Sequence, residues 1–191
     1  MYDRFLRPSR VAAHLVCMSR KTHVHGHVGH KHGELKKHPA LRKNFCFGCG
    51  KDNPDGMRLK FHHEPETNRF IAHFRLAQRF TGPPRHAHGG VIAAILDEAM
   101  SKPSKPLGIM APTIRLTVQY LKPVPLGQKL TAIGWEVRKK GREHLRAAEI
   151  RNEAGEVLST GKGTFLEIHV NGMMNKFLNK TPKRANDRRA P

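Results

Sequence analysis

The sequence is poor in cysteine and has no long apolar run. Its three cysteines, Cys17, Cys46 and Cys49, are too few and odd in number for a disulfide framework. That usage is typical of proteins kept in a reducing compartment, so we predict a cytoplasmic location. No segment approaches the ~18 consecutive apolar residues that a membrane-spanning helix requires, and we therefore expect no membrane partner.

Acidic residues are also scarce, at 15 against 35 lysines and arginines, but the imbalance is uneven along the chain. Residues 44–170 carry 19 basic and 12 acidic side chains, whereas the flanks 1–43 and 171–191 together carry 16 and 3. A uniformly basic surface would suggest nucleic acid as a partner. Because the excess lies mostly in the flanks, we expect a moderately basic domain that has no nucleic-acid partner of its own.

The apolar residues gather in 44–170, which predicts one domain of roughly 120–130 residues between two basic tails, 1–43 and 171–191. The N-terminal tail is rich in histidine and lacks apolar periodicity, so we predict disorder, with loose Zn²⁺ binding or zinc storage as an alternative role. Its first 17 residues are either a weak organellar targeting segment or sequence upstream of a true start at Met18, the interpretation we favour. The histidines concerned are His23, His25, His27, His30, His32 and His38.

Periodic patterns within 44–170 predict two strands, one helix and then four strands. Alternating residues in 57–63 and 69–76 predict a hairpin. Helical spacing of apolar residues predicts a helix over 90–101, ended by Pro103 and Pro106. The later strands are expected at 113–122, 129–139, 142–152 and 157–169. Their short connections require antiparallel neighbours.

This order leaves one helix, about 18 Å long, with only a sheet available to bury it. The sequence therefore predicts an α+β architecture in which an antiparallel six-stranded sheet wraps around one central helix. That arrangement is the hotdog fold.

The predicted helix carries residues suited to catalysis. Gly89 and Gly90 open it, so its first N–H groups lack intrahelical partners and are open to a ligand. The partial positive charge of a helix N-terminus suits a developing oxyanion. Asp97 follows nearly two turns later among apolar residues, where a carboxylate costs free energy unless it is paired or used. Taken alone, these residues also fit the solvated edge of an amphipathic helix.

Three segments resemble hotdog acyl-CoA thioesterases of the phenylacetate-pathway, PaaI-like type. His88-Gly89-Gly90, followed by Asp97 nine residues after the histidine, is similar to their signature. Residues 44–56 resemble the segment that precedes their sheet, and residues 120–127 resemble the strand and turn after their helix. The resemblance covers residues 44–168.

The resemblance implies an enzyme, an acyl-CoA thioesterase, that needs no cofactor. The backbone N–H of Gly89 would polarise the thioester carbonyl, and His88 would shape that pocket. Asp97 would act as nucleophile or general base, with Thr113 orienting the water. The substrate would lie across the interface of a homodimer or a dimer of dimers. A thioester has a good leaving group, so one carboxylate and an oxyanion site can suffice without a metal ion.

The chain departs from the family pattern at Gly82, where several relatives have Asn or Gln. His86 is a candidate to replace that contact. Gly90, at the helix start, is a further candidate for binding the substrate. Basic side chains of the domain are candidates for the phosphates of coenzyme A, with a solvated strand edge and hairpin tip as the alternative. These candidates are Arg115, Lys139, Lys140 and Arg142.

Two further interpretations stay open at this point. Cys46 and Cys49 precede His62 at zinc-finger spacing, but no second histidine follows, so we favour a structural turn with buried thiols over a metal site. The alternative to an enzyme is a non-catalytic hotdog module that binds acyl-CoA or associates with RNA through its tails.

Overall fold

The computed structural model describes residues 43–168 of the 191-residue chain. The two predicted tails lie outside these residues apart from Lys43, and so do Cys17, Met18 and the histidine-rich segment. Within the described part, no helix is long and apolar enough to cross a membrane.

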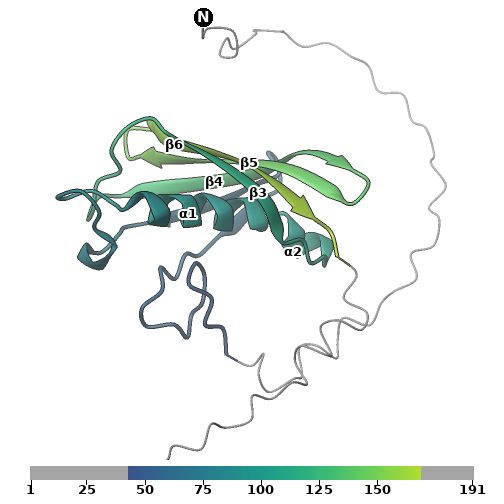
Figure 1. The fold of residues 1–191 in the computed structure, drawn as a ribbon, viewed down its shortest axis with the longest axis horizontal. Helices are drawn as coiled ribbons and strands as arrows, with labels where there is room; N and C mark the ends of the chain where they lie inside the picture. Colours follow the sequence, from purple (N-terminus) through teal and green to yellow (C-terminus); the bar gives the residue numbers. More distant parts are fainter. Residues whose placement is uncertain (1–42, 169–191) are drawn as a thin grey trace, which may run out of the picture. The chain divides into compact units, whose positions relative to one another are not determined.

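The described chain forms a six-stranded antiparallel sheet with the strand order β1-β2-β4-β5-β6-β3 (Figure 1). The strands are β1 (His62–Glu64), β2 (Arg69–Phe74), β3 (Thr113–Tyr120), β4 (Leu130–Lys140), β5 (Glu143–Asn152) and β6 (Val157–Leu166). The helices are η3 (Gln78–Phe80), α1 (Gly89–Ser101) and α2 (Ser104–Leu107). The chain enters β3 directly after the helices, and β3 occupies one edge of the sheet. The predicted order of elements is confirmed.

The first predicted strand, 57–63, is wrong over most of its length. Only its last two residues belong to β1. The residues before them are part of an N-terminal loop, residues 43–61, and their backbone pairs with an earlier part of the same loop. Within this loop, Met57 N–H donates to the Phe47 carbonyl at 2.8 Å and Leu59 N–H to the Gly48 carbonyl at 2.9 Å. Arg58 between them has a φ of 52°, which is incompatible with a continuous strand.

The prolines after α1 act differently from the prediction. The helix ends at Ser101, before Pro103 as expected, but Pro103 then caps the one-turn helix α2, which contains Pro106. Proline is tolerated at the start of a helix, because the N–H that it lacks has no partner there anyway. The prolines therefore redirect the chain into a second turn.

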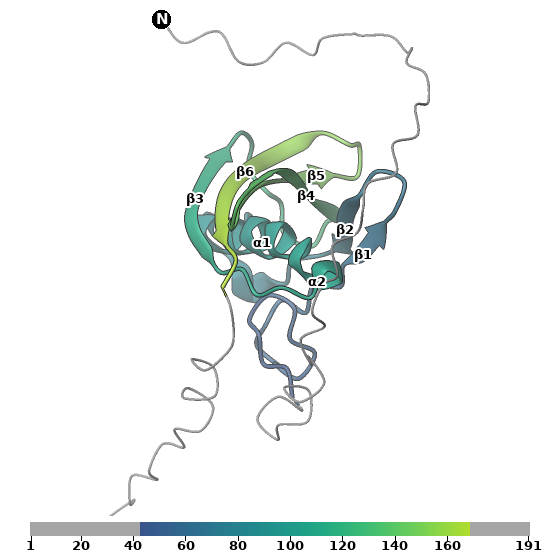
Figure 2. The ribbon, with the colours of Figure 1, turned by 90° about the vertical axis from the view of Figure 1, so that its right-hand side faces the viewer.

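The sheet curls around α1, which lies in its concave side (Figure 2). One face of the helix is buried against β4, β5 and β6, and it supplies much of the hydrophobic core. The buried side chains are Ile92, Ile95, Leu96, Ala99 and Met100. Gly134 on β4 permits close contact, since a Cβ there would lie 2.2 Å from the Ala99 carbonyl oxygen.

A buried guanidinium fixes the C-terminal end of α1. Arg146 on β5 is fully buried and donates to the Met100 carbonyl at 3.1 Å and to the Ser104 hydroxyl at 2.8 Å. Its guanidinium also lies 4.8 Å from the centre of the Phe165 ring. The Met100 carbonyl is one of those that a helix end leaves without an intrahelical partner, so Arg146 stabilises the junction between α1 and α2.

Replacing Gly134 with Ala tests how tightly α1 packs on the sheet. The added methyl overlaps the helix backbone, which cannot move as a flexible side chain would. We expect a loss of about 1–3 kcal/mol in the free energy of unfolding, measured by urea denaturation. Gly89→Ala is the matched control, because a Cβ there meets Tyr120 at an ordinary 3.6 Å. Equal stability of the two variants would contradict the proposed packing.

Candidate active site

The start of α1 is organised by the side chain of His88. This residue is the N-cap, and its Nδ1 accepts a hydrogen bond from Gly90 N–H at 3.0 Å. A nitrogen that accepts cannot carry the proton, so the neutral ring bears its proton on Nε2. Of the two N–H groups that the sequence predicted to be free, Gly90 N–H is bonded to His88. Gly89 N–H has no partner among residues 43–168.

Gly82 is required by the backbone that holds His88. Its ideal Cβ would lie 2.7 Å from the His88 Cα, so the loop as folded has no room for a side chain. The loop is closed by Gly82 N–H donating to the His86 carbonyl at 2.9 Å, and His88 N–H donates to the Phe80 carbonyl at 2.9 Å. Glycine at this position therefore fits a loop that lies against the start of the helix.

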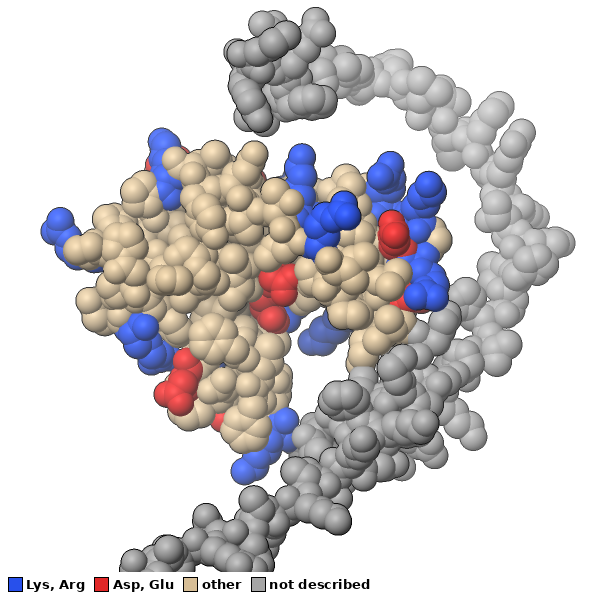
Figure 3. All heavy atoms as spheres, in the orientation of Figure 1, with Lys and Arg blue, Asp and Glu red and all other residues tan. Residues whose placement is uncertain are grey.

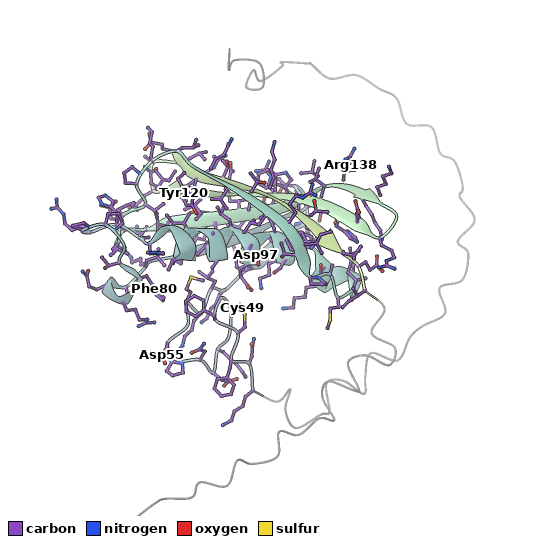
Figure 4. The ribbon with its side chains drawn as sticks, viewed as in Figure 1. Cys49, Asp55, Phe80, Asp97, Tyr120 and Arg138 are labelled. Carbon is purple, nitrogen blue, oxygen red and sulfur yellow. The ribbon has the colours of Figure 1, made fainter. Side chains whose placement is uncertain are left out.

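Asp97 lies on the half-buried side of α1 that faces β3. Its Oδ1 accepts a hydrogen bond of 2.6 Å from the hydroxyl of Thr113, which opens β3. Asp97 is labelled on α1 in Figure 4. Sequence analysis singled out both residues, and the structure brings them together across 16 positions of the chain. The bond uses one carboxylate oxygen and leaves Oδ2 available.

Tyr120 is a site residue that sequence analysis placed only within a matching segment. Its hydroxyl donates to the Gly89 carbonyl at 3.0 Å, so the last residue of β3 is bonded to the first residue of α1. The contact links positions 31 apart in sequence, and neither periodicity nor spacing signals it. Both ends of β3 thus contact the helix, through Thr113 and Tyr120.

Within one chain, the predicted oxyanion contact at Gly89 lies far from the predicted catalytic carboxylate of Asp97. Gly89 and Asp97 are eight residues apart on a continuous helix, which corresponds to about 12 Å at 1.5 Å per residue. A carbonyl bound to Gly89 N–H is consequently out of reach of the Asp97 carboxylate of the same molecule. The chain alone therefore presents two partial sites.

The predicted phosphate-binding residues lie apart from the helix start. Lys139, Lys140 and Arg142 are at the β4–β5 hairpin, beyond the C-terminal end of α1, where Figure 3 shows a gathering of basic side chains. Lys139 contacts the Glu167 carboxylate at 3.2 Å, and this bond holds the pKa of Glu167 below its usual range. Arg142 donates to the Glu167 carbonyl at 3.1 Å.

The other two predicted substrate contacts differ from each other. Arg115 is exposed on the edge strand β3 and is available to a ligand. His86 donates from Nδ1 to the Pro84 carbonyl at 2.9 Å, and its ring lines a surface depression with Gln78 and Pro125. Within residues 43–168 no side-chain hydrogen bond joins it to His88 or Asp97, and its role in place of a side chain at position 82 stays a prediction.

A second polar cluster lies on the other side of α1, against the N-terminal loop. The Sγ atoms of Cys46 and Cys49 and a carboxylate oxygen of Glu98 lie within 4.8 Å of one another. Lys102 forms a salt bridge with Glu98. The expectation of buried thiols is wrong for Cys46, which is exposed, while Cys49 is half-buried. His62 lies beside His73 on the neighbouring strand, with the two rings tilted at a centre-to-centre distance of 5.9 Å, and it is not part of the cluster.

The chain is similar to known thioesterases. A family model described as the thioesterase superfamily matches residues 85–159, which include α1, β3, β4 and β5. The acyl-coenzyme A thioesterase THEM4 of Xenopus laevis is 33% identical over 103 residues, 52% of this chain and 45% of that protein. This chain spans about half the length of the curated relatives that it matches.

Solved structures show the same fold. The crystal structure of a thioesterase superfamily protein is 27% identical, with a TM-score of 0.61 over 64% of this chain and 60% of that chain. The E. coli PaaI protein of the phenylacetic acid degradation operon is 17% identical, with a TM-score of 0.54 over 59% of this chain and 81% of its own. The predicted hotdog fold is confirmed.

Replacing the N-cap tests the arrangement at the helix start. His88→Ala removes the acceptor for Gly90 N–H, and we expect the free energy of unfolding to fall by about 0.5–2 kcal/mol. His88→Asn should recover most of this loss, because asparagine is a favourable N-cap acceptor. Urea denaturation of the three proteins measures both effects, and an unchanged stability of His88→Ala would show that the cap does not form.

Proposed function

We propose that this protein is a hotdog enzyme of the thioesterase superfamily that hydrolyses an acyl-CoA thioester to a free acid and coenzyme A, and the matches to thioesterases support this proposal. The observation that carries the proposal is the 2.6 Å hydrogen bond between Thr113 and Asp97, on a helix whose first N–H remains free. The name of the Xenopus relative supports acyl-CoA as the substrate class.

In this proposal Asp97 supplies the base and Gly89 the oxyanion contact. Water attacks the carbonyl carbon while Asp97 Oδ2 takes its proton, and Gly89 N–H stabilises the negative oxygen. The carbon–sulfur bond then breaks, and the thiolate of coenzyme A receives the proton. Because the Thr113 hydroxyl donates to Asp97, its lone pair is free to accept a hydrogen bond from the attacking water. Direct attack by Asp97, followed by hydrolysis, gives the same products.

We place the complete site between two copies of the chain. The separation of about 12 Å between Gly89 and Asp97 requires that each be completed by a second copy. The edge strand β3 carries exposed apolar side chains, such as Ile114 at 55% and Leu116 at 37%, together with unpaired backbone groups. A second β3 is a suitable partner for such an edge, so a homodimer, or a dimer of dimers, is part of the proposal.

The remaining roles follow from this assembly. His88, with its Nε2 proton, and Gly90 shape the carbonyl pocket, while exposed Arg115 lies on the strand proposed to form the interface. Lys139, Lys140 and Arg142 are proposed to meet coenzyme A phosphates at the far end of the sheet. We retain as proposals the cytoplasmic location and a domain at 44–170 with basic tails.

Thiol release from a panel of acyl-CoAs tests the activity. Asp97→Asn keeps an oxygen for the Thr113 bond but loses the basic carboxylate, so we expect kcat to fall by about 10²–10⁴-fold. Asp55→Asn is the matched control, because Asp55 is exposed on the N-terminal loop (Figure 4) and should leave the rate unchanged.

Either of two results contradicts the proposal. If no acyl-CoA is cleaved faster by the wild type than by Asp97→Asn, the carboxylate has no catalytic role. If the wild type binds acyl-CoA but cleaves none of the panel, the non-catalytic binding module is the better description.

A further inference from the structure

The cluster of Cys46, Cys49 and Glu98 is separate from the proposed thioesterase site. Asp97 and Glu98 are consecutive on α1, but they point to different neighbours: Asp97 contacts Thr113 of β3, and Glu98 contacts the N-terminal loop. The thioesterase chemistry uses none of the three residues in the cluster. The cluster is therefore a candidate for a second function.

The loop is shaped to present both thiols to one carboxylate oxygen. Gly50 N–H donates to the Cys46 carbonyl at 2.9 Å, closing a tight turn, and a Cβ on Gly50 would lie 2.4 Å from that carbonyl oxygen. A Cβ on Gly48 would lie 2.5 Å from Glu98 Oε2, so the lack of a side chain at Gly48 leaves room for the Glu98 carboxylate in its present position. Figure 4 shows Cys49 on this loop, on the side of α1 away from the sheet.

We propose that Cys46, Cys49 and Glu98 bind a Zn²⁺ ion that fastens the N-terminal loop to α1. Their three ligand atoms lie within 4.8 Å of one another. Cys46 Sγ and Glu98 Oε2 are 3.8 Å apart, close to the ~3.5 Å between tetrahedral ligands at zinc–sulfur and zinc–oxygen distances of about 2.3 and 2.0 Å. Two thiolates with one carboxylate select zinc over the harder ions magnesium and calcium.

Lys102 supports the site without being a ligand. It bonds to Glu98 Oε1, which leaves Oε2 directed at the thiols and fixes the carboxylate in place. Burial alone would lower its pKa, but the Glu98 carboxylate raises it, so Lys102 remains charged. Two thiolates and one carboxylate exceed the charge of Zn²⁺ by one, and the ammonium compensates for it.

The thiols must lose their protons when the ion binds. Burial, with the Glu98 carboxylate next, raises the pKa of Cys49 to about 11. Zinc binding displaces the protons of both thiols, because the thiolate is the form of cysteine that binds zinc. Cys46 is exposed, so the fourth coordination position faces solvent and suits a water molecule.

Cobalt substitution in the full chain tests the site. Under reducing conditions we expect Co²⁺ to give a near-ultraviolet thiolate-to-cobalt absorption that saturates at one ion per chain. The tail histidines bind without thiolate and cannot produce this band. Cys46→Ser and Cys49→Ser should each abolish it, and Glu98→Gln should weaken cobalt affinity by at least the roughly 10–100-fold that loss of a supporting residue causes. Cys17→Ser is the matched control and should leave the band intact.

Thermal unfolding with Zn²⁺ supplies a second readout if a cysteine variant folds poorly. Zinc should raise the Tm of wild type and Cys17→Ser, and it should raise that of Glu98→Gln much less. The proposal is overturned if the thiolate band is absent, if it depends on Cys17, or if Glu98→Gln behaves as wild type in both measurements. Isolation of the protein with a Cys46–Cys49 disulfide and no metal binding after reduction would assign the pair to redox chemistry instead.

Discussion

The burial of one face of α1 in the curved sheet determines where the polar side chains of both candidate sites lie. With Leu96 and Met100 buried, the helical rotation of 100° per residue directs Asp97 towards β3 and Glu98 towards the N-terminal loop. The position of the helix along its axis is equally constrained. Gly134 allows close packing in the middle, and Arg146 binds the C-terminal end. A shift of α1 would thus disturb both polar clusters together.

In the proposed mechanism, the same helix explains why one chain would not make a complete site. An oxyanion contact at a helix N-terminus benefits from the first free N–H, whereas the Asp97 carboxylate is held by Thr113 about two turns further along the same helix. The distance of about 12 Å between Gly89 and Asp97 is a property of helix geometry, and local adjustments at either residue leave it unchanged. The exposed apolar edge of β3 offers a surface on which a second copy could supply the missing half.

Much of the fold could be predicted from sequence because alternation and helical spacing are local signals, as in β2 and α1. The failure at 57–61 has a non-local cause, since this backbone bonds to Phe47 and Gly48, earlier in the N-terminal loop, and β2 is left with only a three-residue partner in β1. For the site, spacing indicated Asp97 and the glycine pair, but the name thioesterase came from resemblance. The Tyr120 contact, the reason for Gly82 and the approach of Cys46 to Glu98 all depend on distant segments, so no sequence pattern revealed them.

Subunit complementation tests the central claim, that Asp97 of one chain acts on a carbonyl held at the helix start of another. His88→Ala and Asp97→Asn, each impaired alone, would be co-refolded in equal amounts and assayed for thiol release. If both positions serve one shared site, mixed dimers contain one intact site, and the mixture should recover about one quarter of wild-type activity. Activity no higher than the mean of the two separate variants would contradict a site built from two chains.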